Sequence, residues 1–135
     1  MVVPKFRAWI KTEKRMIETD DLLCIDYENE MVMTQQVYFE NGLPDYRDLD
    51  NFVFEEIELM QSTGLKDKNG VEIFEGDIVK MAKDVYSEPT YYEVVRHRGG
   101  AYRLESKQHG CELWLRNADC EVVGNVYENK ELLDA

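Results

Sequence analysis

The chain alternates apolar and polar residues over short stretches, a period of two that is typical of half-buried β-strands. Turn-forming residues separate these stretches, so we predict a succession of short strands. Residues 22–25 are a continuous apolar run, for which periodicity leaves a buried strand and a short helical turn open. The other predicted strands cover residues 6–10, 16–17, 31–33, 37–39, 78–81, 91–98, 101–105, 113–115 and 120–127.

The stretch most strongly specified by local chemistry is the central segment, residues 64–80. Its Asn69-Gly70 pair predicts a two-residue hairpin turn, because both residue types tolerate the positive backbone angles that such a turn requires. A further turn is expected at residues 75–77, and a second hairpin at the Gly-Gly pair of residues 99–100. These features fold the chain back on itself and indicate no reaction.

Two further segments are read from their composition. Residues 41–44 are expected to interrupt regular secondary structure. The acidic residues 46–51 are expected to form a loop or a single helical turn. Near the end of the chain, Asn129 is expected to cap a last helical turn, because its side chain can accept hydrogen bonds from free backbone amides.

From Ile78 onward the pattern gives five short strands at close spacing, which is typical of a small barrel or sandwich. The Gly-Asp-Ile-Val entry of the first of these strands resembles that of SH3-like barrels. We therefore predict a mainly β protein, with a small SH3-like β-barrel over residues 61–135, a strand-rich N-terminal extension over residues 1–60, and a short C-terminal helical turn. A length of 135 residues fits a single domain over residues 1–135.

The net charge of −12 is concentrated in one part of the chain. Residues 18–58 carry thirteen acidic side chains and one basic one, whereas residues 1–17 carry one acidic and five basic, and residues 59–135 carry fourteen acidic and ten basic. Because attraction to phosphates dominates nucleic-acid affinity, this acidic segment disfavours nucleic acid as a partner. No apolar run approaches the ~20 residues needed to cross a bilayer, and no secretion signal opens the chain, so we expect a cytoplasmic protein without membrane contact.

No residue spacing typical of a metal site is present in the sequence. Asp48-Leu49-Asp50 begins like a calcium loop, but Val53 stands where that loop needs Gly for its sharp turn. The zinc-type side chains lack any recognised spacing; they are His97, His109, Cys111 and Cys120. We therefore expect no metal.

Catalysis is not indicated either. The sequence has no nucleophile elbow and no Gly-rich loop that would cradle phosphates. The three cysteines, which include Cys24, are odd in number and widely spaced, as in proteins of a reducing compartment. We predict that the protein is not an enzyme and holds no cofactor. A deep pocket gathering His97 or His109 with a carboxylate would point to catalysis instead.

The acidic segment, residues 18–58, carries the main functional hypothesis. Aromatic side chains interrupt the carboxylates, so the segment could steer and anchor a basic protein partner. The alternative is that these aromatics belong to the core and the carboxylates simply face water. Exposed strand edges also make a homo-oligomer reasonable. The candidate partner-binding residues are Tyr27, Tyr38, Tyr46, Asp48, Asp50 and Phe54.

A second hypothesis concerns the basic hairpin tip at residues 96–103. Three arginines and one aromatic lie around this predicted turn, a set that could hold a phosphate or stack a base. The alternative is a solvated turn whose tyrosine packs on its own sheet. The candidate residues for this nucleic-acid-associated function are Arg96, Arg98, Tyr102 and Arg103.

Three separated blocks of sequence carry a resemblance to a known family. They are residues 5–9 (KFRAW), residues 58–80 (ELMQSTGLKDKNGVEIFEGDIVK) and residues 121–129 (EVVGNVYEN) followed by Leu132 and Leu133. Together they resemble the YopX family of phage and prophage proteins, from which the chain departs at Ile10 and Lys130. The resemblance implies a small β-rich, phage-associated protein inside a bacterial host, and it implies no catalysis.

Overall fold

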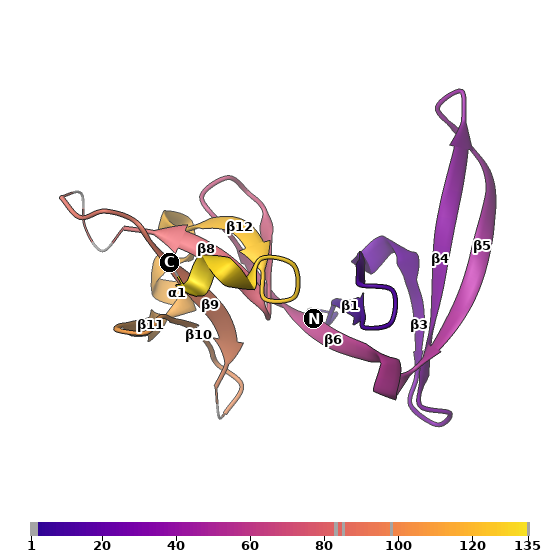
Figure 1. The fold of residues 1–135 in the computed structure, drawn as a ribbon, viewed down its shortest axis with the longest axis horizontal. Coiled ribbons are helices and arrows are strands. Elements are labelled where there is room, and N and C mark those ends of the chain that lie inside the picture. Colours follow the sequence, from indigo (N-terminus) through magenta and orange to yellow (C-terminus); the bar gives the residue numbers. More distant parts are fainter. Residues whose placement is uncertain (1–2, 83, 85, 98, 135) are drawn as a thin grey trace. The chain divides into compact units, whose positions relative to one another are not determined.

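The structure of the protein is a computed structural model that describes residues 3–82, 84, 86–97 and 99–134. These residues form a mainly β fold, which confirms the fold class predicted from the alternating pattern (Figure 1). The strands are β1 (Phe6–Ile10), β2 (Arg15–Ile17), β3 (Leu22–Asp26), β4 (Met31–Glu40), β5 (Leu43–Val53), β6 (Ile57–Lys66), β7 (Glu72–Phe74), β8 (Asp77–Met81), β9 (Thr90–Arg96), β10 (Tyr102–Glu105), β11 (Gly110–Glu112) and β12 (Glu121–Asn125). The helical turns are η1 (Thr19–Asp21), η2 (Phe54–Glu56), α1 (Leu113–Arg116), η3 (Asn117–Asp119) and η4 (Lys130–Asp134).

The chain divides into two compact units, an N-terminal unit of Met1–Gln61 and a C-terminal unit of Ser62–Ala135. Strand β6 begins in the first unit and ends in the second. This division falls beside the predicted change from the strand-rich extension to the barrel-like part. The organisation of both parts as one domain stays a prediction.

In the N-terminal unit, β1 pairs with β2 on one side and with β6 on the other, both antiparallel. Strands β3, β4 and β5 form a separate antiparallel sheet in that order. Ala8 and Ile10 lie on one face of β1 and are fully buried, and Arg7 and Trp9 on its other face are buried too. The core of this unit consists of Ala8, Ile10, Ile17, Val32, Phe52 and Ile57.

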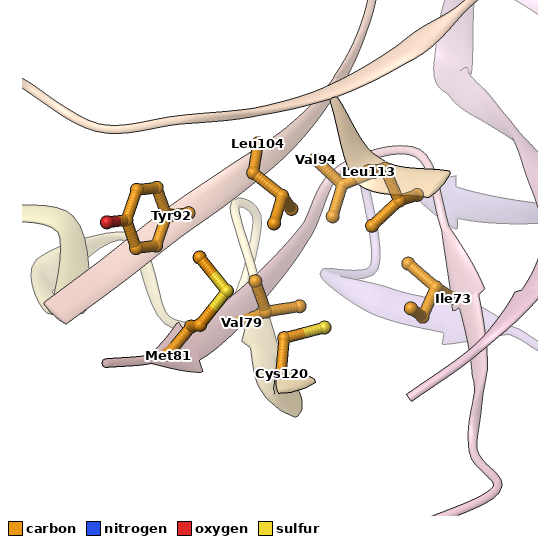
Figure 2. Packing of buried hydrophobic residues seen from close by; sticks show 8 residues of the cluster. All are labelled: Ile73, Val79, Met81, Tyr92, Val94, Leu104, Leu113 and Cys120. Carbon is orange, nitrogen blue, oxygen red and sulfur yellow. The ribbon is translucent and has the colours of Figure 1, made fainter. Parts of the chain in front are cut away.

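In the C-terminal unit, β8 to β11 follow one another as an antiparallel meander, and β12 returns to pair with β8. The strand order is therefore β11-β10-β9-β8-β12. Figure 2 shows the cluster of buried hydrophobic side chains that forms the core of this unit. They are Ile73, Val79, Met81, Tyr92, Val94, Leu104, Leu113 and Cys120.

Several local predictions hold. The run at residues 22–25 lies in strand β3, one of its two alternatives. The Gly-Gly pair at residues 99–100 lies in the connection between β9 and β10, which pair antiparallel, so this hairpin is confirmed. The C-terminal helical turn is present as η4. Its predicted cap is wrong, however, because the Asn129 side chain accepts a hydrogen bond from the Asn125 N–H at 3.2 Å, toward the preceding strand.

Two other element predictions are wrong. Residues 113–115 were predicted as a strand but form part of α1, and only Leu113 of this apolar run is buried in the core. The fourth strand of the meander is β11 instead. Residues 46–51 form part of β5 and not a loop. The prediction failed because these side chains are polar, and a strand that is exposed on both faces does not need alternating apolar residues. Its strand conformation is fixed by its pairing with β4.

Candidate partner-binding ribbon

Strands β4 and β5 form a long two-stranded ribbon in the N-terminal unit (Figure 1). Strand β3 pairs with β4 only over Met31–Thr34, and beyond Thr34 the described part of β4 pairs with β5 alone. The ribbon turns at Asn41 and Gly42, whose φ angles are +53° and +79°. Two central residues with positive φ match the twist of a β-hairpin, so this pair forms the tight turn that aligns the two strands.

One face of the ribbon gathers four of the predicted partner-binding residues. Tyr38 lies opposite Tyr46, and their rings stack with centroids 4.6 Å apart and an interplanar angle of 16°. Asp48 and Asp50 follow Tyr46 at alternate positions of β5, so their side chains lie on the same face. We call these four residues the acidic–aromatic face.

This face continues the core-facing side of the sheet beyond the core. Val32 and its partner Phe52 are buried at the base of the ribbon, and Thr34, opposite Asp50, is also buried. Farther out, Asp48 and Tyr46 are exposed and Tyr38 is half-buried. A hydrogen bond with Asp48 raises the pKa of the Tyr38 phenol, with smaller contributions from burial and from the Asp48 charge. The stacked tyrosine pair and the Asp48 carboxylate are therefore in contact with each other.

The opposite face of the ribbon is largely apolar. Phe39 is 65% exposed and Leu49 is 51% exposed, and Met33 lies exposed on the same face nearer the base. Arg47 donates a hydrogen bond through Nη1 to Gln35 Oε1 at 3.0 Å. The ribbon thus combines a negatively charged face with an apolar one.

The other two predicted residues lie together at the base of the ribbon. Tyr27 contacts Phe54 edge to face, with ring centroids 6.0 Å apart and an interplanar angle of 74°. Phe54 packs against the core of the N-terminal unit, whereas Tyr27 is 69% exposed. The six predicted residues therefore form two separate groups.

The basic hairpin tip differs in its electrostatics. Arg103 forms ion pairs with Glu112 (Nη1 to Oε1, 2.6 Å) and with Glu105 (Nε to Oε1, 3.3 Å). Tyr102 is half-buried and packs against the core of its own unit, and burial raises its pKa. Arg96 is exposed, and Arg98 lies outside the described residues. Glu105 and Glu112 thus offset the positive charge of Arg103, which an anion would need.

Sequence reasoning missed two buried carboxylates in the central segment, Asp67 and Asp77, which are 5% and 1% exposed. Asp67 Oδ1 accepts hydrogen bonds from the N–H groups of Asn69 (2.8 Å) and Val71 (2.9 Å), and its Oδ2 accepts one from the N–H of Val122 (2.8 Å). Asp77 Oδ2 accepts one from the N–H of Phe74 at 2.7 Å. Both carboxylates therefore hold backbone together.

These bonds change the central turn. Residues 67–71 connect β6 and β7, which pair antiparallel, so the predicted hairpin is confirmed but its two-residue turn is wrong. Gly70 has φ +80°, whereas Asn69 does not take a positive φ. Burial on its own raises the pKa of Asp67, but the three backbone hydrogen bonds outweigh it and hold that pKa below its usual value. The signal was present in the sequence, because an Asp can accept from the amide two residues on and form an Asx turn.

A hollow of about 360 Å³ in the C-terminal unit is lined in part by Tyr91, Ser106, His109 and Leu132. His109 is present there, but the described lining residues include no carboxylate. Ser106 Oγ accepts hydrogen bonds from the N–H groups of Gln108 and His109, so it holds its own loop. Elsewhere in the part of the chain that the structure describes, no cluster of three or more His, Cys, Asp or Glu side chains could hold a metal ion. None of the described helices has the length and apolar character to span a membrane.

A sequence model of the family described as YopX protein matches residues 5–134. The chain belongs to the YopX family. The resemblance carried by the three sequence blocks is thereby confirmed. In the third of these blocks, Gly124 leaves room for Asn129, since a Cβ at Gly124 would lie 2.4 Å from Asn129 Oδ1.

Two solved structures are similar to this chain over nearly its whole length. The crystal structure of protein EF1440 from Enterococcus faecalis is 32% identical, with a TM-score of 0.65 over 98% of this chain and 99% of that chain. The X-ray structure of yopX from Bacillus subtilis is 23% identical, with a TM-score of 0.66 over 96% of this chain and 97% of that chain. None of the curated proteins matches this chain.

Proposed function

We propose that this YopX-family protein is a non-catalytic interaction module that binds a basic protein partner through the acidic–aromatic face of its ribbon. The observation that carries the proposal is the row of stacked tyrosines and carboxylates on a ribbon that extends beyond the core. Nothing in the core requires these side chains, since every residue of β5 from Leu43 to Asn51 is exposed.

The chemistry of this face favours a cationic partner. Tyrosine rings attract Lys and Arg side chains through their negative faces, and the neighbouring carboxylates add charge attraction. The thirteen acidic side chains of residues 18–58 would also steer a basic protein toward the ribbon. Exposed tyrosines are frequent anchors of protein interfaces, because they bury a large area with few rotatable bonds.

The proposal also covers the fold of the C-terminal unit and the cellular location of the protein. We infer that the C-terminal unit is an SH3-like barrel. In such barrels a four-stranded meander is followed by a short helical turn and a fifth strand that pairs with the first, and the order β11-β10-β9-β8-β12 has this form. The phage association and the cytoplasmic location follow the family resemblance. Self-association stays a prediction.

Affinity capture from bacterial lysate tests the proposal. The wild-type protein is compared with the double variant Asp48→Asn/Asp50→Asn, and with Glu28→Gln/Glu55→Gln as a control that removes the same charge from exposed positions off the acidic–aromatic face. We expect a basic protein that is retained at low salt, released at moderate salt, lost by the ribbon variant and kept by the control. Equal capture by all three proteins, or no salt-sensitive partner, would overturn the proposal.

A further inference from the structure

Strand β5 is an open edge of its sheet. It is the last strand in the order β3-β4-β5, and no other strand of the described residues pairs with its outer side. Alternate residues of such a strand direct their N–H and C=O groups toward solvent, so the edge is a template for another strand. The exposure of residues 43–51 leaves this side of the ribbon accessible.

Proteins usually block such edges with proline, bulges or charge. Here the proline and the bulge lie near the tip, and of these devices only charged side chains, Arg47, Asp48 and Asp50, lie along the rest of the edge. Pro44 and the bulge that follows it are close to the Asn41-Gly42 turn. From Tyr46 to Val53 the register with β4 continues without interruption. This part of β5 therefore presents a regular edge on which a further strand could lie.

The side chains along the regular edge specify the chemistry of its occupant. An added strand would place alternate residues beside Tyr46, Asp48 and Asp50 on one face. Its other residues would lie beside Arg47 and Leu49, on the apolar face. A segment in which basic and apolar residues alternate fits both faces at once.

A second copy of this chain fits poorly. If two β5 strands paired antiparallel, the two-fold axis between them would be perpendicular to the sheet. The acidic–aromatic faces of both copies would then lie on the same side of the combined sheet. In the register centred on Leu49, Asp48 of each copy lies opposite Asp50 of the other. Like charges directly opposite each other destabilise a strand pair. The charge pattern therefore favours a basic strand from a different protein.

We infer that β5 binds its partner by strand addition, taking an extended segment of alternating basic and apolar residues onto the edge from Tyr46 to Val53. This inference deepens the proposed function and rests on it. Backbone hydrogen bonds would supply affinity, and the alternation of charged and apolar contacts would supply selectivity.

The probe is a short synthetic peptide in which Lys and Val alternate, and its control has the same composition with the Lys and Val residues in two blocks. Binding is followed by calorimetry, and amide hydrogen exchange is followed residue by residue. We expect the alternating peptide to slow exchange at every second amide of residues 46–51, because only the outward N–H groups gain partners. Two lost charge contacts in Asp48→Asn/Asp50→Asn should weaken binding about tenfold. The Glu28→Gln/Glu55→Gln control should bind like the wild type.

The outcomes separate the inference from the proposed function. Binding of the alternating peptide with protection in β5, and weaker binding of the block peptide, supports strand addition. Binding without protection of β5 amides overturns strand addition, and the lysate capture can still support the acidic–aromatic face. Capture of a basic partner from lysate without any binding of the alternating peptide also overturns the inference. The inference is also overturned if the free protein has a dimeric mass and protected β5 amides, because a second copy of the chain would then occupy the edge.

Discussion

The central segment and the β4–β5 ribbon contain the same devices and use them in opposite ways. Each region has an Asn-Gly pair and several aspartates, two in the central segment and three in the ribbon. In the central segment the carboxylates of Asp67 and Asp77 are buried and accept backbone N–H groups. In the ribbon, Asp48 and Asp50 are exposed, and the Asn-Gly pair alone makes the turn.

The difference shows what determines the role of a carboxylate in this fold. A buried carboxylate that accepts several N–H groups satisfies backbone that would otherwise be left unpaired, so its loss exposes more than one orphaned donor. An exposed carboxylate remains solvated and keeps its charge available to a partner. We therefore expect substitutions in the central segment to change stability and substitutions in the ribbon to change binding.

The largest effect is expected for Asp67→Ala. The variant loses the acceptor for three backbone N–H groups, and those of Val71 and Val122 lie in partly buried surroundings. We expect the free energy of unfolding to fall by about 3 kcal/mol. Urea denaturation monitored by circular dichroism measures it. As a matched control, Asp48→Ala should change the free energy of unfolding by less than about 0.5 kcal/mol. Similar losses in the two variants would break the comparison.

A smaller effect is expected from pH. Because the pKa of Asp67 is lower in the folded protein than in the unfolded chain, its ionised form stabilises the fold above the unfolded value of about 3.9. This contribution is lost as the pH falls through the folded pKa. The free energy of unfolding of the wild type should therefore decline below about pH 4 more steeply than that of Asp67→Asn.

Urea titrations of both proteins at a series of acidic pH values provide the measurement. Protonation of other carboxylates affects both proteins alike, so the difference between the two curves reports on residue 67. Parallel curves for the wild type and Asp67→Asn would show that this carboxyl contributes nothing to the acid sensitivity of the fold.

The same two regions show how far the sequence could lead. Pattern and β-prone composition predicted most of the strands, whose core positions include Ala8 and Ile10 on β1 and Val79 and Met81 on β8. The same rule failed for β5, which has polar residues on exposed faces and is held by its register with β4. The four residues of the acidic–aromatic face were selected from composition, but only the register shows that they share one face.

The two Asn-Gly pairs cannot be distinguished as dipeptides, and the one local sign of a different turn is Asp67, two residues before Asn69. Both sequences favour a two-residue turn, and only at Asn41-Gly42 do the flanking residues Glu40 and Leu43 pair directly. At Asn69-Gly70 the side chain of Asp67 competes for the amides, and its third bond goes to Val122, far along the chain. Long-range contacts of this kind are not visible in a local pattern, so the tighter turn was assigned to the wrong pair.

The smallest effect is expected from replacing Asn in the two pairs. Asn41 has φ +53°, a conformation that Asn tolerates better than Ala, so Asn41→Ala should weaken the ribbon tip by about 1 kcal/mol. Asn69 contributes its backbone N–H to Asp67, which alanine retains, so Asn69→Ala should have little effect. A ribbon tip can open without unfolding the core, so amide hydrogen exchange over residues 38–46 is the suitable measurement. Exchange about fivefold faster in Asn41→Ala, with wild-type rates in Asn69→Ala, is the expected result. Equal rates in both variants would mean that the turn of the ribbon is specified by strand pairing and not by its Asn-Gly pair.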